Sequence, residues 1–296
     1  MSQPLNDNML TGLEAYAVDI TREAGAILSR YFGRSLDVQY KDNSHKDPVT
    51  IADKVTQKFL SQAITDRFPD HSFLGEEDTE QDNSPAQDFV WVVDPLDGTK
   101  NFVAGLPIYS CSVGVMYRGV PVVGAVFIPW PCDNNGVVVH ARKGAGAFVD
   151  QQPISVLQAH KFRRNALNAV PGSLRTERSV YEGIQSKIGE FRTTGSIAYE
   201  LAMTAKGVLG CTITTAPKLW DVAGGIVLVR EAGGMVVRFQ KKRLLGGLIN
   251  TIRQEPVETL VPSWHQGLTT IHHLRQWSTP LALGNPRLVQ DITSHI

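Results

Sequence analysis

The amino-acid sequence predicts an α+β fold in which layers of helix pack on layers of sheet. Two long apolar segments, Ile108–Tyr117 and Val120–Ile128, are joined by Arg118-Gly119, which is typical of an antiparallel hairpin. The second half of the chain instead alternates between helical and strand-like segments. Hairpins combined with this alternation favour a layered architecture over a simple barrel. The 296 residues suffice for one large domain, or for two lobes that share a substantial core.

The first predicted element is an amphipathic helix over residues 12–32. Apolar side chains recur there at helical spacing, after a polar segment at residues 1–10 that resembles a loose tail. Thr11 and Glu14 have the spacing of a capping box at the helix start. Gly33 is expected to end the helix, because glycine readily adopts the conformation that closes one.

A second helix is expected to begin at Thr50, a good N-cap residue, and to end before Pro69-Asp70. A short strand near residues 38–40 and a polar loop at 41–49 precede it. Asp53 lies in its first turn, where a favourable interaction with the helix dipole is the simplest role. The predicted apolar face consists of Val55, Phe59, Ala63 and Ile64.

The remaining elements are shorter, and turn residues separate them. Strands are expected at 137–141, 147–149, 165–170, 191–194, 208–214, 235–239 and 280–283. Helices are expected at 176–188, 196–205, 217–232 and 286–292. The polar stretch near residues 150–161 marks a boundary between lobes.

Composition excludes several classes of function. Acidic and basic residues balance at 29 each, so there is no basic excess for nucleic acid and no polybasic tail for a membrane surface. No apolar run approaches the roughly 20 residues needed to span a bilayer. The N-terminal residues are polar, without the apolar core of a signal peptide. Cys111, Cys132 and Cys211 lie far apart, which favours reduced, buried thiols in a cytoplasmic protein.

The most informative segment runs from Val90 to Phe102. Its first four residues are apolar and predict a buried strand, after which Pro95 forces the backbone to turn. Asp94 and Asp97 flank this turn, and two carboxylates with a turn carbonyl suit hard divalent cations. A helix beginning after Gly98 would present free amides that suit a phosphate group. An ordinary Asp-Gly surface turn would explain Asp97-Gly98 alone, but not the whole segment.

Two other acidic positions have both a structural and a functional interpretation. Three adjacent acids follow Gly75, and such a run is usually a solvated turn, although a metal ion would relieve their mutual repulsion. Asp221 lies in a first helical turn, where it could serve only as a partner for the helix dipole. The neighbouring Trp220 is equally well explained by core packing and by a place beside the site.

Taken together, these segments resemble the inositol monophosphatase family, which belongs to the Mg-dependent, lithium-sensitive phosphatases. The resemblance extends over about residues 12–237 and the last strand and helix. The segments that carry it are Lys41 with Asp47 and Asp53, Gly75-Glu76-Glu77, Asp94 to Thr99, Gly195-Ser196-Ile197-Ala198, and Leu219 to Gly225 with Glu231-Ala232-Gly233-Gly234. Each segment alone is a weak signal, but their joint occurrence in this order is specific.

The resemblance implies an αβαβα sandwich that forms one domain over residues 10–296. Its lobes would span about 10–150 and 160–296, with an insert at about 240–278. It also implies a homodimer that binds two to three Mg²⁺ ions per site.

The resemblance further assigns roles to individual residues. Glu76, Asp94 and the Leu96 carbonyl would bind one metal ion. Asp94, Asp97 and Asp221 would bind a second, and Glu76 with water a weaker third. Asp53 and Thr99 would orient the attacking water together with Glu76 and Glu77. The implied substrate-binding residues are Gly98, Thr99, Gly195, Ser196 and Asp221.

The leading functional hypothesis is a Mg-dependent phosphomonoesterase that acts on a small phosphorylated polyol such as inositol 1-phosphate. A metal-activated water would attack directly, without a covalent phosphoenzyme. The same chemistry on histidinol phosphate, a sugar bisphosphate or a 3′-phosphonucleotide is an alternative. A non-catalytic family member that binds proteins is an alternative of another class, although every implied metal ligand is present.

The chain departs from the family pattern in two places. Inositol-preferring members commonly carry an acidic residue seven positions before the aspartate matched by Asp221, and Thr214 occupies that position here. This substitution predicts modest selectivity for inositol phosphate and leaves the phosphatase chemistry untouched. The second departure is the insert, which contains His272-His273. Adjacent histidines on a helix point in different directions, which disfavours a metal site there.

Overall fold

A computed structural model describes residues 5–35, 37–40, 48–78, 82–130, 136–158, 166–173, 189–244, 249–265 and 267–293, with backbone only at 240–244 and 249–254. Lys41, Asp47, Cys132 and the helix expected at 176–188 lie outside the described residues.

A seven-stranded sheet forms the first half of the fold. Its strand order is β3-β4-β5-β6-β7-β8-β9, so all neighbours are also consecutive along the chain. β3 and β4 are parallel, and every other neighbouring pair is antiparallel. The strands are β3 (Ser72–Gly75), β4 (Phe89–Asp97), β5 (Ser110–Tyr117), β6 (Val120–Ile128), β7 (Val137–Arg142), β8 (Ala147–Val149) and β9 (Gln152–Ile154).

A six-stranded sheet of order β11-β10-β12-β15-β13-β14 forms the second half. Parallel pairing joins β10 to both β11 and β12, and the remaining pairs are antiparallel. The strands are β10 (Leu167–Ala169), β11 (Glu190–Arg192), β12 (Leu209–Thr214), β13 (Met235–Leu244), β14 (Ile249–Pro256) and β15 (Leu281–Gly284). A separate pair, β1 (Val38–Tyr40) and β2 (Pro48–Thr50), lies between the first two helices in sequence.

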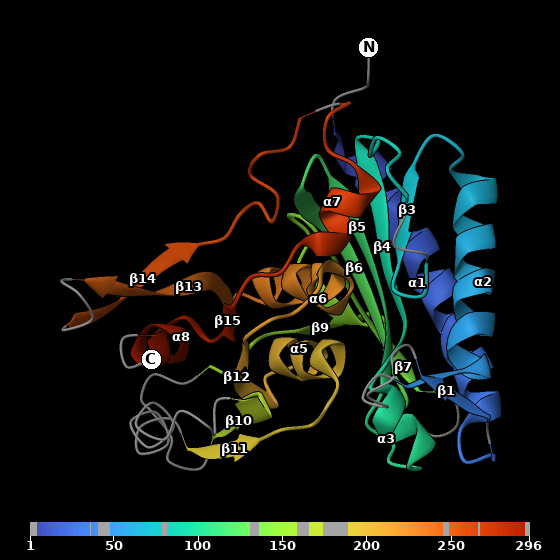
Figure 1. Ribbon diagram of the computed structural model, residues 1–296. Coiled ribbons are helices and arrows are strands. Elements are labelled where there is room, and N and C mark those ends of the chain that lie inside the picture. The colour runs from blue at the N-terminus through green and yellow to red at the C-terminus, as the bar shows by residue number, and fades with distance from the viewer. Residues whose placement is uncertain are drawn as a thin grey trace.

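Helices cover both sheets and give an αβαβα arrangement (Figure 1). Helices α1 (Asp7–Tyr31) and α2 (Ile51–Arg67) cover the outer face of the seven-stranded sheet. Helices α5 (Ile197–Ala205) and α6 (Leu219–Glu231) lie between the two sheets, and α8 (Pro286–Thr293) covers the far face of the second sheet. Two short helices complete the fold, α3 (Thr99–Val103) and α7 (Ile271–Gln276). The layered architecture expected from the sequence is confirmed.

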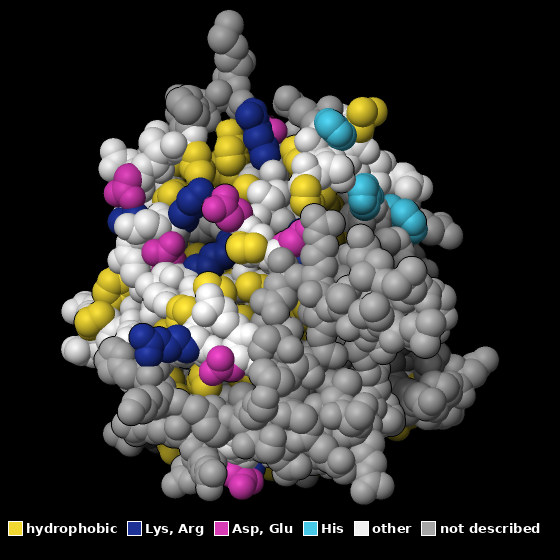
Figure 2. Space-filling view, turned by 90° about the vertical axis from the view of Figure 1, so that its left-hand side faces the viewer, with side chains coloured by type: hydrophobic (Ala, Val, Ile, Leu, Met, Phe, Trp, Pro, Cys, Tyr) yellow, Lys and Arg dark blue, Asp and Glu magenta, His cyan; other side chains and the backbone are white. Residues whose placement is uncertain are grey.

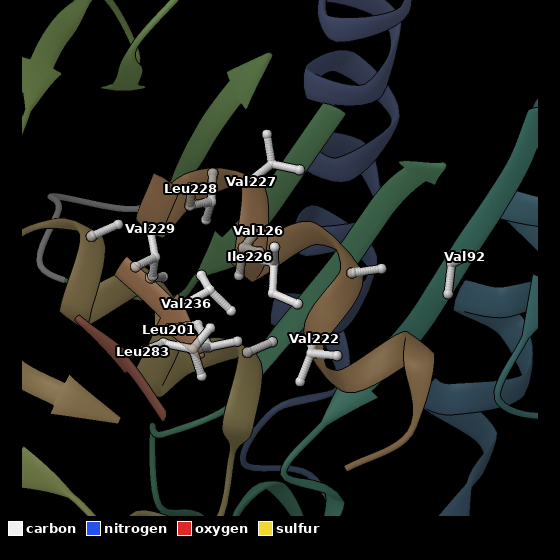
Figure 3. Packing of buried hydrophobic residues seen from close by; sticks show 14 of the residues in the cluster. Val92, Val126, Leu201, Val222, Ile226, Val227, Leu228, Val229, Val236 and Leu283 are labelled. Atoms are coloured by element: carbon white, nitrogen blue, oxygen red, sulfur yellow. The ribbon is translucent and has the colours of Figure 1, made fainter. Parts of the chain in front are cut away.

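The central layer is the largest core of the molecule. Ile226 and Leu228 of α6 are fully buried, and Val92 of the first sheet and Leu283 of the second belong to the same apolar cluster (Figure 3). Helix α6 lies very close to the first sheet, because a Cβ placed on Gly124 would come within 2.2 Å of the Gly224 carbonyl oxygen. Glycine is therefore needed at this contact, which fixes the position of α6 and of the residues in its first turn.

Several boundaries differ from the sequence expectation. Helix α1 begins at Asp7, because the Asn6 side chain accepts a hydrogen bond from the Met9 N–H and acts as the N-cap. The tail expected at 1–10 is therefore too long. The capping box expected at Thr11 and Glu14 is wrong, since the Thr11 hydroxyl donates to the Asp7 carbonyl inside the helix.

The inward face of α2 is more polar than expected. Asp53, Thr56, Gln57, Leu60 and Ile64 are buried, whereas Val55, Phe59 and Ala63 are only half-buried. Two of these polar side chains, Asp53 and Gln57, hydrogen-bond segments near the pocket described below. In the expected insert, the structure shows an extension of β13, the partner strand β14 and helix α7. Strand β9 was not expected.

The described surface carries charges of both signs. On the face shown in Figure 2, Lys and Arg side chains are interspersed with Asp and Glu, and no extended field of one sign covers the described part of that face. Among the helices of the described residues, none combines the length and apolar character required to cross a membrane. Cys111 and Cys211 are free and buried, and burial raises the pKa of both thiols.

Candidate active site

Strand β4 carries the two aspartates of the central motif to one end of the first sheet. The strand continues past Pro95 to Asp97, which corrects the expectation that it stops before Pro95. Asp94 pairs with Ser112 and Asp97 with Ser110, so one extra residue on β4 forms a bulge. Gly98 then adopts a φ of 91°, and α3 begins at Thr99. The helix start expected there is confirmed, as is the need for glycine before it.

Two other segments bring acidic residues to the same end of the sheet. Glu76 directly follows β3, and its backbone N–H donates to the Val93 carbonyl of β4 at 3.0 Å. Asp221 lies in the first turn of α6, where its Oδ2 accepts a hydrogen bond from the Lys218 N–H at 2.7 Å. The dipole interpretation of Asp221 is therefore compatible with the structure, but it does not explain why Asp221 shares a pocket with three other acidic residues.

These segments enclose a pocket of about 220 Å³, which we call the acidic pocket. Four carboxylates line it together with backbone and small polar groups from distant parts of the chain. Its lining residues are Pro48, Glu76, Asp94, Leu96, Asp97, Gly98, Thr99, Lys100, Gly195 and Asp221. The acidic residues come from β4, from the segment after β3 and from α6, so the fold gathers groups that are up to 145 positions apart, from Glu76 to Asp221.

The carboxyl groups of the acidic pocket destabilise one another's charges. Burial raises the pKa of Asp94 far above its usual value, and the nearby charges of Glu76, Asp97 and Asp221 raise it further. A hydrogen bond between the Glu76 and Asp94 carboxyl groups acts in the same direction. Burial likewise raises the pKa of Asp97 to about 7, although hydrogen bonds from Ala198 and Ser196 oppose the shift. Burial and the charge of Asp97 raise the pKa of Asp221.

This donor set fits a hard divalent cation. Such ions prefer carboxylate and carbonyl oxygens, and a bound cation would offset both the burial and the mutual repulsion that raise these pKa values. Within the described ranges, however, no three acidic, histidine or cysteine side chains are already gathered into a closed metal-binding group. Each aspartate also accepts a hydrogen bond from the protein, which holds part of its carboxylate in place. The acidic pocket is therefore open, and a bound cation would bring its carboxylates closer together.

Asp53 and Thr99 form a connected pair at the edge of the acidic pocket. The Thr99 hydroxyl lies 3.1 Å from Asp53 Oδ1 and 3.0 Å from the Leu96 carbonyl oxygen. The other oxygen of Asp53 accepts from the Thr50 backbone N–H and hydroxyl, so Asp53 also completes the cap of α2. Asp53 is only 1 % exposed and does not line the pocket, whereas Thr99 does.

Ser196 connects the pocket to helix α5. Its hydroxyl donates to Asp97 Oδ2 at 2.8 Å, and the Ala198 N–H donates to the same oxygen at 2.5 Å. Asp97 therefore anchors the N-terminus of α5, and Ser196 is buried behind it while Gly195 lines the pocket. The Asn101 side chain reinforces this arrangement, because it donates to the carbonyls of both Ile108 and Thr194.

The structure brings most of the predicted site residues together, but not all. Glu77 does not line the acidic pocket, and its backbone N–H donates to Gln57 in α2. Lys100 and Pro48 line the pocket and were missed by the sequence analysis. The position of Lys100 directly after Thr99 was an available signal, because a cationic side chain beside the expected phosphate site suits an anionic ligand.

Thr214 does not lie where the specificity argument required it. The residue ends β12, is 2 % exposed and does not line the acidic pocket. Its hydroxyl oxygen is buried and makes no hydrogen bond in the described structure. A glutamate introduced here would bury a charge instead of presenting an acceptor to the pocket, so substitution of Thr214 is not a usable test of substrate selectivity.

An αβαβα sandwich with four carboxylates gathered at the end of a mixed sheet is typical of a class of phosphatase folds. Comparison with known proteins gives the family: residues 9–272 match the model of the inositol monophosphatase family. The chain therefore belongs to the inositol monophosphatase family, a family of phosphatases.

Three relatives illustrate this membership. A fructose-1,6-bisphosphatase/inositol-1-monophosphatase from Aquifex aeolicus is 32% identical over 216 residues, which cover 71% of this chain and 80% of the relative. The Nus factor SuhB of Xylella fastidiosa is 31% identical over 230 residues, which cover 75% of this chain and 80% of the relative. The structure of the Thermotoga maritima IMPase supports the fold, with a TM-score of 0.71 at 24% identity over 94% of this chain and 95% of that one.

Proposed function

We propose that this protein is a Mg²⁺-dependent phosphomonoesterase that hydrolyses a small phosphorylated polyol, such as inositol 1-phosphate. The observation that carries the proposal is the convergence of Glu76, Asp94, Asp97 and Asp221 on one pocket. Four acids gathered in one pocket are costly for a folded protein, and a bound cation would offset that cost. Membership of the inositol monophosphatase family supports the same chemistry.

In this proposal the acidic pocket holds two to three Mg²⁺ ions. Glu76, Asp94 and the Leu96 carbonyl would hold one ion, and Asp94, Asp97 and Asp221 a second, with Glu76 and water supporting a weaker third. Bound Mg²⁺ would supply positive charge for the phosphate group and would make a nearby water more acidic. Asp94, at the centre of the cluster, would contribute to two ions.

The Thr99 hydroxyl is suited to orient the attacking water. It can donate its single hydrogen to Asp53 Oδ1, and its lone pairs then remain available to accept from a water in the pocket. Asp53 is held by Thr50 at the start of α2, so the hydroxyl has a fixed partner. Glu76 would accept a proton from the same water. Glu77 is proposed to support this arrangement indirectly, because its backbone is held by Gln57 outside the pocket.

The phosphate group would lie against the turn that joins β4 to α3. Gly98 and Thr99 line the pocket there, Lys100 adds a positive charge, and Gly195 lines the pocket from the segment before α5. Ser196 and Asp221 would border the alcohol part of the substrate, Ser196 by fixing the adjacent loop. A pocket of about 220 Å³ suits a small substrate. Histidinol phosphate, a sugar bisphosphate and a 3′-phosphonucleotide remain candidate substrates of the same chemistry.

The test is a phosphate-release assay over this substrate panel with and without Mg²⁺. We expect release that requires Mg²⁺ and is abolished by a chelator, with the best turnover on a small polyol phosphate. The same assay on Thr99→Ala should show a large loss of kcat with a smaller change in KM, because the hydroxyl orients water more than it binds substrate. Absence of turnover on every substrate at saturating Mg²⁺ would refute the enzymatic proposal.

A second candidate is a family member that works through protein contacts. It is favoured by one observation, the similarity to a relative named Nus factor SuhB. The two candidates predict different outcomes for the acidic pocket. A protein-binding member would keep its partner interaction when Asp94 is replaced, whereas the phosphatase would lose turnover.

A homodimer in the cytoplasm is part of the proposal for the phosphatase, and sedimentation of the purified chain tests the dimer.

A further inference from the structure

Arg275 of helix α7 extends from the insert toward the acidic pocket and is only 6 % exposed. Its guanidinium donates to the Gly75 carbonyl at 2.5 Å and to the Glu76 carbonyl at 3.2 Å. The same group lies over the Trp220 ring, 5.2 Å from its centroid. Arg275 therefore contacts both segments that deliver carboxylates from outside β4, namely the segment after β3 and the first turn of α6.

Neither the family match nor the predicted site accounts for this residue. The family model ends at residue 272, so Arg275 lies just beyond the matched span. Arg275 does not line the acidic pocket, and its hydrogen bonds given above go to backbone carbonyls. Its salt-bridge partner is Asp78 at 3.7 Å, a residue of the turn after β3 that also stays out of the pocket.

Helix α7 is firmly attached to the first half of the fold. The Ile271 N–H donates to the Ser84 carbonyl at 3.0 Å, and the His272 N–H donates to the Asp82 carbonyl at 2.8 Å. Thr270 forms an isolated bridge with Pro85, and the Trp277 indole donates to the Leu260 carbonyl. These contacts fix the backbone of α7, from which the Arg275 side chain extends to Gly75, Glu76 and Trp220.

The turn that Arg275 contacts is held on its other sides as well. The Gly75 N–H donates to Asp78 Oδ2, the Glu76 N–H donates to Val93, and the Glu77 N–H donates to Gln57. Arg275 donates to the carbonyls of Gly75 and Glu76, and the Asp78 N–H also donates to the Gly75 carbonyl. With both backbone faces of the turn held, the direction in which the Glu76 side chain leaves the backbone is set.

We propose that Arg275 is a positioning residue for the cation site. By holding both the backbone of Glu76 and the ring of Trp220, which adjoins Asp221, it fixes the separation between these two segments of the pocket. The inference rests on the proposed function, because it assigns Glu76 and Asp221 to that site. Through Arg275, the insert would complete the pocket, although no insert residue lines it among those described.

The geometry requires arginine and not simply a positive charge. A guanidinium is a planar fork that donates to two acceptors at once while its face stacks on an aromatic ring. A lysine ammonium is a compact charge on a flexible stem, so it could serve one carbonyl but would lose the fork and the stacking. The conservative variant Arg275→Lys therefore separates the role of charge from the role of geometry.

Positioning and simple electrostatics predict opposite signs for Mg²⁺ binding. If Arg275 acted only as a charge near the acidic pocket, its removal would strengthen binding of Mg²⁺, because two positive charges repel each other. If Arg275 positions Glu76 and Trp220, its removal weakens binding, as loss of an outer partner to a metal ligand does. A merely structural role would lower stability and leave the Mg²⁺ affinity of the folded protein unchanged.

The experiment is calorimetric titration of Mg²⁺ alone into wild type, Arg275→Met and Arg275→Lys, with folding verified by near-UV circular dichroism. Arg230→Lys is the matched control. Arg230 is another partly buried arginine that donates to a carbonyl, that of Val257, but it lies in the last turn of α6, at the opposite end from Asp221. We expect both Arg275 variants to weaken Mg²⁺ binding by about tenfold or more, and Arg230→Lys to leave it unchanged.

A parallel activity measurement provides a second readout. The Mg²⁺ concentration for half-maximal phosphate release should rise in the Arg275 variants, while KM for inositol 1-phosphate at saturating Mg²⁺ changes little. Folded Arg275 variants that bind Mg²⁺ as tightly as wild type, or more tightly, would overturn the inference and leave the proposed function intact. If Arg275→Met does not fold, Arg275→Lys decides the question by the same criterion. A wild type that binds no Mg²⁺ would overturn the proposed function, and the inference with it.

Discussion

Two groups of charged side chains in this protein are arranged in opposite ways. In the paired cluster, between α1 and the β7–β9 edge of the first sheet, Glu14 accepts from His140 at 2.7 Å and from Arg142 at 3.2 Å. Arg142 also pairs with Asp7, and His140 contacts the Asp150 carbonyl at 2.8 Å. In the acidic pocket, by contrast, four carboxylates face one another and raise the pKa values of Asp94, Asp97 and Asp221.

The difference shows which charges serve the fold and which serve a ligand. Each acid in the paired cluster has a basic partner from another element, so the cluster ties α1 to the sheet without any added ion. The acidic pocket has an excess of one sign that its own hydrogen bonds only partly offset. A folded protein retains such an excess against its own stability, which is typical of a binding or catalytic site.

The largest effect is expected from Asp94→Asn. This change should lower kcat/KM by more than about a hundredfold, since even loss of an outer partner to a metal ligand typically costs 10–100-fold. In the absence of metal, the midpoint of thermal unfolding should stay the same or rise, because one repulsive neighbour is removed. Phosphate release near the wild-type rate at saturating Mg²⁺ would show that Asp94 is not a metal ligand.

The second-largest effect is expected from lithium, which should act at the acidic pocket and not at the paired cluster. By resemblance to the lithium-sensitive phosphatases, a small monovalent ion in the second metal position would retain phosphate without supplying the charge needed for turnover. We therefore expect Li⁺ to inhibit phosphate release at fixed Mg²⁺, with Na⁺ as the control at equal ionic strength. Indifference of the rate to Li⁺ would indicate a different geometry at the second position.

Glu14→Gln is expected to have the converse effect of Asp94→Asn. It replaces the carboxylate shared by His140 and Arg142 with a neutral amide that keeps only one acceptor oxygen. A hydrogen bond to a charged group contributes about 1.5–3 kcal/mol. The free energy of unfolding should fall by about that amount in denaturant titrations, while kcat and KM stay unchanged. A loss of activity without a loss of stability would contradict the assignment of this cluster to the fold.

How far the sequence predicts this molecule depends on whether the determinant is local. The β5–β6 hairpin, the Thr50 cap and the helix start after Gly98 follow from nearby residues, and the structure confirms them. The grouping of Glu76, Asp94, Asp97 and Asp221 depends on contacts across the whole chain, so only the family resemblance made it predictable. The start of α1 was misjudged because Asn6 and Thr11 are both acceptable caps.

The contribution of the insert could not be predicted from the sequence. Arg275 carries no local signal, because its role depends on the docking of α7 against residues 82–86 and on carbonyls about 200 positions away. Thr214 illustrates the reverse case, in which a family-based position implied a pocket residue and the structure buries it. In both cases tertiary contacts, and not local pattern, decide what the side chain can touch.

The smallest effect is a pH dependence of the paired cluster. Burial alone would lower the pKa of His140, but the hydrogen bonds to Glu14 and to the Asp150 carbonyl raise it above 6.5 overall. A raised pKa in the folded state stabilises the protein at low pH, and this contribution is lost as the pH rises through the folded value. The difference in unfolding free energy between wild type and His140→Gln should therefore be largest below pH 6.5 and should shrink as the pH rises above that value. A difference that grows over this range would contradict the assignment.

The most direct test of the contrast is thermal unfolding of wild type, Glu14→Gln and Asp94→Asn as Mg²⁺ is added to metal-free protein. A ligand that binds only the folded state raises the unfolding midpoint with its concentration. We expect Mg²⁺ to raise the midpoint of wild type and of Glu14→Gln by the same amount, although Glu14→Gln starts lower, and to leave Asp94→Asn almost unmoved. A wild-type midpoint that does not respond to Mg²⁺, or an equal response in Asp94→Asn, would contradict the claim that the acidic pocket is a cation site.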